Sequence, residues 1–359
     1  MKAGEPLRDY SLVGPDSAQA VERGLATAEW YRSDIPRKRM KELMKRSDHP
    51  ALRDTVIWVG AMIVLGGLGG WFWGSWLAVP FFLAYGVLYG SSSDSRWHEC
   101  GHGTAFRTRW MSDVVYQIAS FMIMREPTVW RWSHTRHHTD TLIVGRDPEI
   151  VAMRPPRLLK IIANFFGLVD VPVAFRKMII HATGRLTEDE TTFIPEMERM
   201  KVYSTARIWL AIYAAVAIAC VVVGSILPAM LIGLPRIYGT WLHLVFGLTQ
   251  HAGLAEDVLD HRLNSRTVYM NPVLRFLYWN MNYHLEHHMF PMVPYHALPA
   301  LHAEIKADSP LPRRGLVGAY REIIPAMLRQ LRDPSHFVHR RLPDGARPFV
   351  SAGDIAAAE

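Results

Sequence analysis

Residues 55–93 read TVIWVGAMIVLGGLGGWFWGSWLAVPFFLAYGVLYGSSS and contain no Asp, Glu, Lys or Arg. A second charge-free stretch covers residues 208–235, and Arg236 is the only full charge between 208 and 255. About 20 apolar residues suffice to cross the ~30 Å hydrocarbon core of a bilayer as a helix. Residues 55–93 and residues 208–255 are therefore each long enough for two helices. Helices of soluble proteins rarely run this far without a charge. The sequence therefore predicts a multi-pass membrane protein.

We expect an all-α chain with four transmembrane helices arranged in two hairpins. The first hairpin should turn near Gly66–Gly74, where glycines and three tryptophans are typical of a turn at a membrane interface. The second should begin at Ile208 and break around Gly224–Pro235, so that its second helix carries His243 and His251. A shorter apolar stretch at 161–175 is too short to span and predicts an interfacial helix.

The charged regions place both chain ends on one side of the membrane. With four spans, the N-terminal arm (1–54), the segment 94–207 and the tail share one face. A basic run precedes the first apolar stretch, and such runs favour the cytoplasmic side. We expect a desaturase-like membrane domain at 55–305 with a cytoplasmic histidine-rich cap, a cytoplasmic tail at 306–359, and a bacterial inner membrane as the location. The basic run consists of Arg37, Lys38, Arg39, Lys41, Lys45 and Arg46.

Composition excludes several classes of protein. The net charge is +7, but 33 acidic residues are mixed with 40 basic ones, which argues against nucleic acid as a partner. The two cysteines, Cys100 and Cys220, support neither a disulfide framework nor a cysteine-bound iron–sulfur cluster. The first residues lack an apolar core, so we expect no cleaved signal peptide.

The seventeen histidines carry the chemistry of the sequence, because eight of them fall in three clusters. Residues three or four apart share a helix face, so the first histidine of each cluster can point at the same centre as a later one. Adjacent histidines diverge by about 100° and can serve two metals. Asn271, Pro272 and Pro291 predict the ends of one helix that carries the third cluster. The clusters are His98 and His102; His134, His137 and His138; and His284, His287 and His288.

Eight clustered imidazoles exceed the three or four ligands that one zinc ion needs, so two metal ions are the economical interpretation. Imidazole binds iron, copper, zinc and nickel, and ligand type alone does not choose among them. A ninth ligand is expected from the last apolar helix, where a lone histidine should face the interior. We favour His251 for this position and keep His243 as the alternative.

The order of these clusters, with a single histidine before the third, resembles the membrane fatty acid desaturase/hydroxylase superfamily over roughly residues 50–305. The stretch Asn282-Tyr283-His284-Leu285-Glu286-His287-His288 is especially typical of it. Within the superfamily, the motifs and the segment 145–149 are most similar to desaturase-like oxygenases named for rhizopine catabolism.

The resemblance implies a non-haem diiron centre held by the eight clustered histidines and His251, with O2 as co-substrate. It also implies an external electron donor, a ferredoxin that in the rhizopine branch is of Rieske type, together with its reductase. The expected reaction is oxidation of an unactivated C–H bond of a lipid or hydrocarbon chain, by desaturation or hydroxylation. The alternative is oxidative O-demethylation of a small polar substrate such as a rhizopine.

Ligating histidines usually donate their second N–H to a carboxylate or carbonyl group. Five acidic residues are candidates for this role, and we favour Asp140 and Asp147. Glu99 follows His98 directly and points about 100° away from it. The other three candidates are Asp94, Glu256 and Glu286.

Three rival functions remain at this point. A membrane zinc protease could use His98-Glu99-Cys100-Gly101-His102 as an H-E-x-x-H motif, with Glu99 as the general base. That reading leaves the second and third clusters unexplained. A haem-binding electron carrier would need paired histidines within the bilayer, and a metal transporter would need ligands near its midplane. Most of these histidines instead flank the predicted spans.

Overall fold

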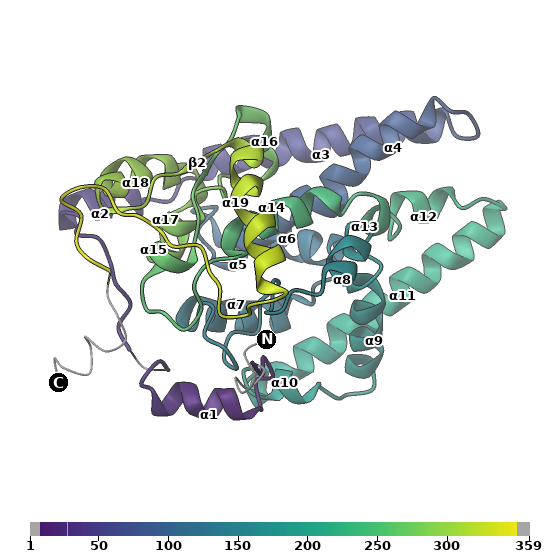
Figure 1. The fold of residues 1–359 in the computed structure, drawn as a ribbon. Helices are drawn as coiled ribbons and strands as arrows, with labels where there is room; N and C mark the ends of the chain where they lie inside the picture. The colour runs from purple at the N-terminus through teal and green to yellow at the C-terminus, as the bar shows by residue number, and fades with distance from the viewer. Residues whose placement is uncertain (1–7, 27, 350–359) are drawn as a thin grey trace.

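The computed structural model describes residues 8–26 and 28–349, and its regular structure is mostly helical, as predicted (Figure 1). The strands in this part of the chain are two residues long. β1 (Val268–Tyr269) pairs in parallel with β2 (Arg313–Arg314), with Val268 opposite Arg313.

The helices follow one another with short connections. Short segments of other helix types adjoin the ends of some α-helices. They are the π-helix η1 (Val87–Ser92) and the 3-10 helices η2 (Glu196–Glu198), η3 (Tyr295–Ala297) and η4 (Lys306–Asp308). The α-helices of the described residues are α1 (Pro15–Glu22), α2 (Arg37–Leu43), α3 (Asp48–Trp71), α4 (Ala78–Gly86), α5 (Ser93–Gly101), α6 (Arg109–Met122), α7 (Pro127–Thr139), α8 (Leu158–Asn164), α9 (Asp170–Ala182), α10 (Glu188–Thr191), α11 (Arg199–Val223), α12 (Leu227–Leu231), α13 (Pro235–Tyr238), α14 (Trp241–His251), α15 (His261–Asn264), α16 (Pro272–Leu277), α17 (His284–Met289), α18 (Leu298–Ile305) and α19 (Gly315–Gln330).

The first apolar stretch forms a helical hairpin. Its turn comes after Trp71, at Gly74, because α3 continues through the glycine cluster. Two of these glycines serve packing: a Cβ on Gly66 would lie 3.1 Å from the Tyr85 ring, and one on Gly69 would lie 3.0 Å from Phe82. The returning helix is continuous from α4 through η1 into α5, and so leads directly from the apolar stretch to the first histidine cluster.

The second apolar stretch forms a long helix with a broken return. α11 ends at Gly224, whose left-handed φ of 64° is typical of a helix C-terminus. The chain returns as α12, α13 and α14, interrupted at Gly233 and Pro235. The predicted second helix is therefore only the 11 residues of α14, shorter than a span requires.

Two helices in the described residues, α3 and α11, are long and apolar enough to cross a membrane. Most of their large apolar side chains are exposed, as expected of helices that face hydrocarbon. The hairpins α3–α4 and α11–α12 project to the same side of the molecule (Figure 1). Their tips are joined by a hydrogen bond of 3.0 Å from Trp73 Nε1 to Ser225 Oγ.

The segment between the hairpins differs from a single interfacial helix. The apolar stretch 161–175 is divided between α8 and α9 by a turn at Gly167, whose φ is 62°. α9 packs along α11 through Met178, Ala206 and Trp209.

The helix predicted for the third histidine cluster is two helices. Asn271 caps the first through the Leu274 amide and Pro272 follows it, as the sequence predicts. This helix stops at Leu277, and Trp279 and Asn280 then take positive φ angles of 44° and 55°. The break turns α17 away from α16 and buries all six of its side chains. α19 packs against α14, so part of the tail segment covers the core. The division of the chain at residues 54 and 305 stays a prediction.

Candidate metal centre

The structure brings all nine predicted histidines together. They lie at the end of α5, along α7, at the last residue of α14 and along α17. They form two groups. Each histidine contributes one ring nitrogen, and within a group these nitrogens lie within 4.8 Å of one another. The first group is His98, His102, His134, His138 and His287, and the second is His137, His251, His284 and His288.

The Nε2 atoms of the first group converge on one point. The His98 and His287 Nε2 atoms are 2.7 Å apart, and His134 Nε2 lies 3.0 Å from His98 and 3.1 Å from His102. His138 Nε2 lies 3.1 Å from both His134 and His287. A neutral imidazole carries one proton, on either Nδ1 or Nε2. Where the proton is on Nδ1, Nε2 offers a lone pair, and a cation at the point of convergence would bind these lone pairs.

The second group is built in the same way. His284 Nε2 lies 2.9 Å from His251 Nε2 and 3.0 Å from His288 Nε2. The His137 ring lies 4.8 Å from the His288 ring and 5.3 Å from the His251 ring, between centroids. Four neighbouring imidazoles match the ligand type that iron, copper and zinc accept.

Helical spacing explains how two clusters supply both groups. In α7, His134 and His138 are four residues apart and enter the first group, whereas His137 enters the second. In α17, His284 and His288 enter the second group, and His287 enters the first. Adjacent histidines diverge around the helix axis, and the two helices therefore contribute to both centres.

Two carboxylates and one carbonyl oxygen contact the Nδ1 atoms of three histidine rings and so fix their orientation. His137 Nδ1 lies 2.8 Å from Asp147 Oδ2, and His134 Nδ1 lies 2.9 Å from Glu149 Oε2. The His251 Nδ1 atom lies 2.7 Å from the Asn264 carbonyl oxygen. Such partners select the tautomer that leaves Nε2 free for a metal ion.

The predicted partners of the histidines divide accordingly. Asp147 contacts a histidine, His137, as predicted for a partner of a ligand. The buried Asp140 carboxylate instead accepts from Arg146 Nε at 3.0 Å and lies 3.6 Å from Arg136. In the described structure Asp140 therefore pairs with arginines and is not brought to a histidine. Glu149, which orients His134, was missed; its position two residues after Asp147 in the same loop is the only signal of it.

The remaining acidic candidates have other partners. Glu256 binds Arg8 and Arg154, and Glu286 Oε1 lies 2.5 Å from Nδ1 of His302. Asp94 pairs with Arg125 at 2.6 Å and with His243 at 3.2 Å. His243 thus lies outside both histidine groups, and geometry favours His251 as the ninth member.

Burial would lower the pKa of His137, but the Asp147 carboxylate raises it, whereas other rings of the site are held neutral. Burial, and then the neighbouring rings, hold the pKa of His138, His287 and His288 well below its ordinary value. Burial alone would raise the pKa of Glu149, but His134 lowers it to about 2, so this carboxylate is charged. Neutral rings at His138, His287 and His288 and an ionised Glu149 are protonation states that suit a metal site.

The H-E-x-x-H motif does not form an isolated zinc site. Glu99 is fully buried, and its Oε2 accepts from the Tyr295 amide at 3.0 Å and from Thr104 at 3.1 Å. These bonds hold the carboxylate in the protein interior. His98 and His102 belong to a group of five, more ligands than zinc takes.

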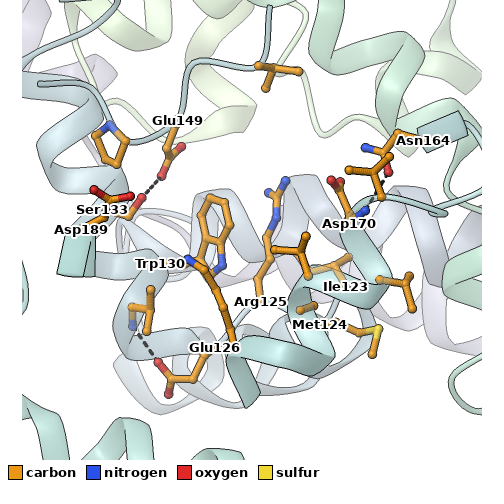
Figure 2. A pocket seen from close by; sticks show the side chains of 18 of the residues that line it. Ile123, Met124, Arg125, Glu126, Trp130, Ser133, Glu149, Asn164, Asp170 and Asp189 are labelled. Atoms are coloured by element: carbon orange, nitrogen blue, oxygen red, sulfur yellow. Dashed lines mark hydrogen bonds between the residues drawn. The ribbon is translucent and has the colours of Figure 1, made fainter. Parts of the chain in front are cut away.

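Two adjoining cavities lead to the histidines. The larger, of about 540 Å³, lies beside α7, α9 and α11, and Figure 2 shows Arg125 and Trp130 standing into it. The smaller, of about 100 Å³, is lined by members of both histidine groups. Arg125, Trp130 and His243 are among the residues that line both cavities, together with Glu149, Ile150, Val151 and Leu244.

The sequence was also compared with known proteins. The family described as "Fatty acid desaturase" matches residues 74–316, which is more than half of the chain.

An omega-3 fatty acid desaturase of the endoplasmic reticulum from Nicotiana tabacum is 25% identical over 62% of this chain and 64% of its own length. An sn-2 acyl-lipid omega-3 desaturase (ferredoxin) of the chloroplast from Arabidopsis thaliana is 23% identical over 83% of this chain and 70% of its own length. A fatty acid conjugase from Calendula officinalis is 23% identical over 57% of this chain and 62% of its own length. The match spans just under two thirds of the first and last of these relatives. With its two histidine groups, the chain belongs to the fatty acid desaturase family.

Proposed function

We propose that the chain is an O2-dependent oxidoreductase that holds two iron ions, one in each histidine group, and oxidises an unactivated C–H bond. The observation that carries the proposal is the sorting of nine buried or half-buried histidines into groups of five and four. When bound, an iron pair supplies the activation of O2 and the removal of hydrogen from carbon. The donor set fits such a pair because every ligand is an imidazole nitrogen, a ligand type that iron accepts.

The residues of the chain do the remaining work. Asp147 and Glu149 keep the protons of His137 and His134 on Nδ1, so that Nε2 points inward. The small cavity holds the reacting carbon beside the histidines and excludes bulk water. The position of that carbon decides between an alkene and an alcohol as the product.

The substrate proposed first is an acyl chain of a lipid, on which the relatives named for omega-3 desaturation act. In this proposal four chain segments enter the bilayer: α3, the helix from α4 to α5, α11, and the broken return through α14. We propose a bacterial inner membrane with the histidines on its cytoplasmic side, and the basic run before α3 supports that orientation. The electron donor is a ferredoxin with its reductase, in line with the ferredoxin named for the Arabidopsis relative.

One observation favours the second candidate, a small polar substrate such as a methoxylated rhizopine that loses its methyl group on oxidation. Arg125 and His243, which line both cavities, pair with Asp94 of the smaller one, and Arg125 lies 4.3 Å from the Trp130 ring centre. A hydrocarbon chain beside this cluster would displace water from charged groups, which is costly. A hydroxylated substrate would offer the cluster further hydrogen bonds in place of that water.

Metal analysis of the detergent-purified protein tests the proposal directly. We expect two irons per chain after anaerobic loading, with Mössbauer parameters of a coupled, nitrogen-ligated pair. His287→Ala should lose iron and turnover but remain in the membrane fraction, and His243→Ala, outside both groups, should keep its iron. One zinc per chain that persists through iron loading would contradict the proposal. Turnover of an acyl lipid or of a methoxylated cyclitol, each supplied with reduced ferredoxin, then separates the two substrates.

A further inference from the structure

A stacked pair of rings links the surface to the second histidine group. Trp30, between α1 and α2, is partly exposed and lies flat on His261, with ring centroids 4.2 Å apart and an angle of 6° between the planes. The His261 ring in turn lies 5.2 Å from that of His288. His261 is buried and belongs to neither histidine group. One intervening ring thus separates a surface indole from a proposed ligand.

The fold holds this stack in place from both sides. Trp30 Nε1 donates to the Thr139 carbonyl at the end of α7, at 2.9 Å. The next amide, that of Tyr31, donates to the Leu259 carbonyl at 2.9 Å, just before α15. The indole is therefore fixed to the chain segments that carry the histidines. Figure 1 shows the α1–α2 link running past α15, on the side away from the hairpin tips.

Basic residues outnumber acidic ones in the chain segment that contains Trp30. Between residues 22 and 46 the sequence has eight Lys and Arg against four Asp and Glu. Arg32 is exposed, and Arg23 is half-exposed beside Asp257. Complementary charge accelerates the encounter of two proteins and orients them.

We propose that Trp30 and His261 form the route by which electrons reach the metal centre, and that an acidic one-electron iron–sulfur carrier docks over Trp30. This rests on the function proposed above. Each reduced carrier would give up one electron, which would pass through the two rings and His288 to an iron held by the second histidine group and reduce it from ferric to ferrous. The carrier leaves oxidised, and two carriers serve one turnover. Electron tunnelling weakens exponentially with distance, so contacting rings favour this path to the second histidine group.

The test compares two reductants of the iron-loaded, full-length protein. Anaerobic reduction of the ferric centre is followed by stopped-flow absorbance, with either a reduced plant-type ferredoxin or the methyl viologen radical, which needs no docking site. Trp30→Ala should slow reduction by ferredoxin several-fold, leaving iron content and the viologen rate unchanged. Trp30→Phe keeps a stacking ring and should stay close to wild type. Trp110→Ala, which removes another exposed tryptophan, is the matched control.

Arg32→Glu gives an independent measurement of docking. It should weaken ferredoxin binding and lower the ferredoxin rate most at low salt, because surface charge is screened at high salt. An unchanged ferredoxin rate in Trp30→Ala with intact iron would overturn the inference, and so would an equal loss with both reductants. A protein that takes up no iron and is reduced by neither would overturn the proposed function as well. The two failures are therefore distinguishable.

Discussion

At the scale of single residues, two neighbouring aspartates have different roles. Asp147 accepts from His137 and from two backbone amides, whereas Asp140 pairs with arginines. We expect Asp147→Ala to lower iron affinity about 10–100-fold, the usual effect of losing such a partner. Asp140→Ala should bind iron like wild type. Competition with a chelator of known affinity measures both. Equal affinities for the two variants would show that Asp147 does not orient a ligand.

The Glu190 carboxylate makes stability depend on pH. Burial would raise its pKa, but His181 at 2.8 Å and Lys177 at 3.0 Å lower it from 4.5 to about 2. The stabilisation is therefore complete above pH 4.5 and is lost as the pH falls toward 2. Glu190→Gln should cost about 1–3 kcal/mol at pH 7.

Melting curves of wild type and Glu190→Gln from pH 7 down to pH 3 check this expectation. The difference in melting temperature should stay constant to about pH 5 and shrink below it. Glu188→Gln, on the exposed side of the same helix, should show no such difference. A gap that widens in acid would mean that Glu190 is protonated in the folded protein.

The sequence predicted which histidines come together better than it predicted the carboxylates that contact their Nδ1 atoms. His134 and His138 could be paired from helical spacing alone, because both lie on one face of one helix. Glu149 reaches His134 from a loop, and no local periodicity encodes that approach. The pairing of Asp140 with Arg146 could not be anticipated for the same reason.

At the scale of elements, the two apolar stretches touch at their backbones. A Cβ on Gly239, after α13, would lie 1.9 Å from the Gly86 carbonyl oxygen of α4. Backbone atoms cannot move aside as a flexible side chain can, so we expect Gly239→Ala to destabilise the protein by about 1–3 kcal/mol. Gly70→Ala in α3 meets no atom within 4 Å and is the control. Thermal unfolding in detergent measures both; similar melting temperatures would refute the close approach.

The first hairpin was predictable because its apolar run is unbroken and its turn contains Gly74. One of the two breaks in the fold was predicted. The return of the second stretch is interrupted at Gly233 and Pro235, within the break expected at Gly224–Pro235, whereas the α16–α17 break at Trp279 and Asn280 was not predicted. Asn280 is of a type that often adopts positive φ, but a bulky residue such as Trp279 rarely does. Tertiary packing, with Trp279 stacked 4.4 Å from Tyr295, accounts for a turn that local sequence does not encode.

At the scale of the whole molecule, Arg262 joins the two ends of the described chain. Its buried guanidinium binds Asp260 and Asp308, donates to the carbonyl oxygen of Arg347 and lies 3.6 Å from the centre of the Tyr31 ring. Arm, core and tail meet at this one side chain. Removal of a buried charged partner is costly because the remaining groups lose their hydrogen bonds.

We expect Arg262→Ala to loosen both ends together. Hydrogen–deuterium exchange should rise in segments 28–36 and 340–349, with little change in α3 or α11. Arg329→Ala, an exposed arginine on α19, should leave both segments protected. Faster exchange in one segment alone would mean that the two are anchored separately.

The hydrogen bond between Trp73 and Ser225 has a consequence for how the protein sits in lipid. α3 and α11 contain 24 and 25 residues, about 36 Å each at 1.5 Å per residue. Because this bond joins their far tips, we expect α3 and α11 to tilt together when the bilayer thickness changes. For the acyl substrate proposed above, the depth of the cavity mouth among the headgroups would then depend on lipid composition, and with it the carbon that reaches the histidines.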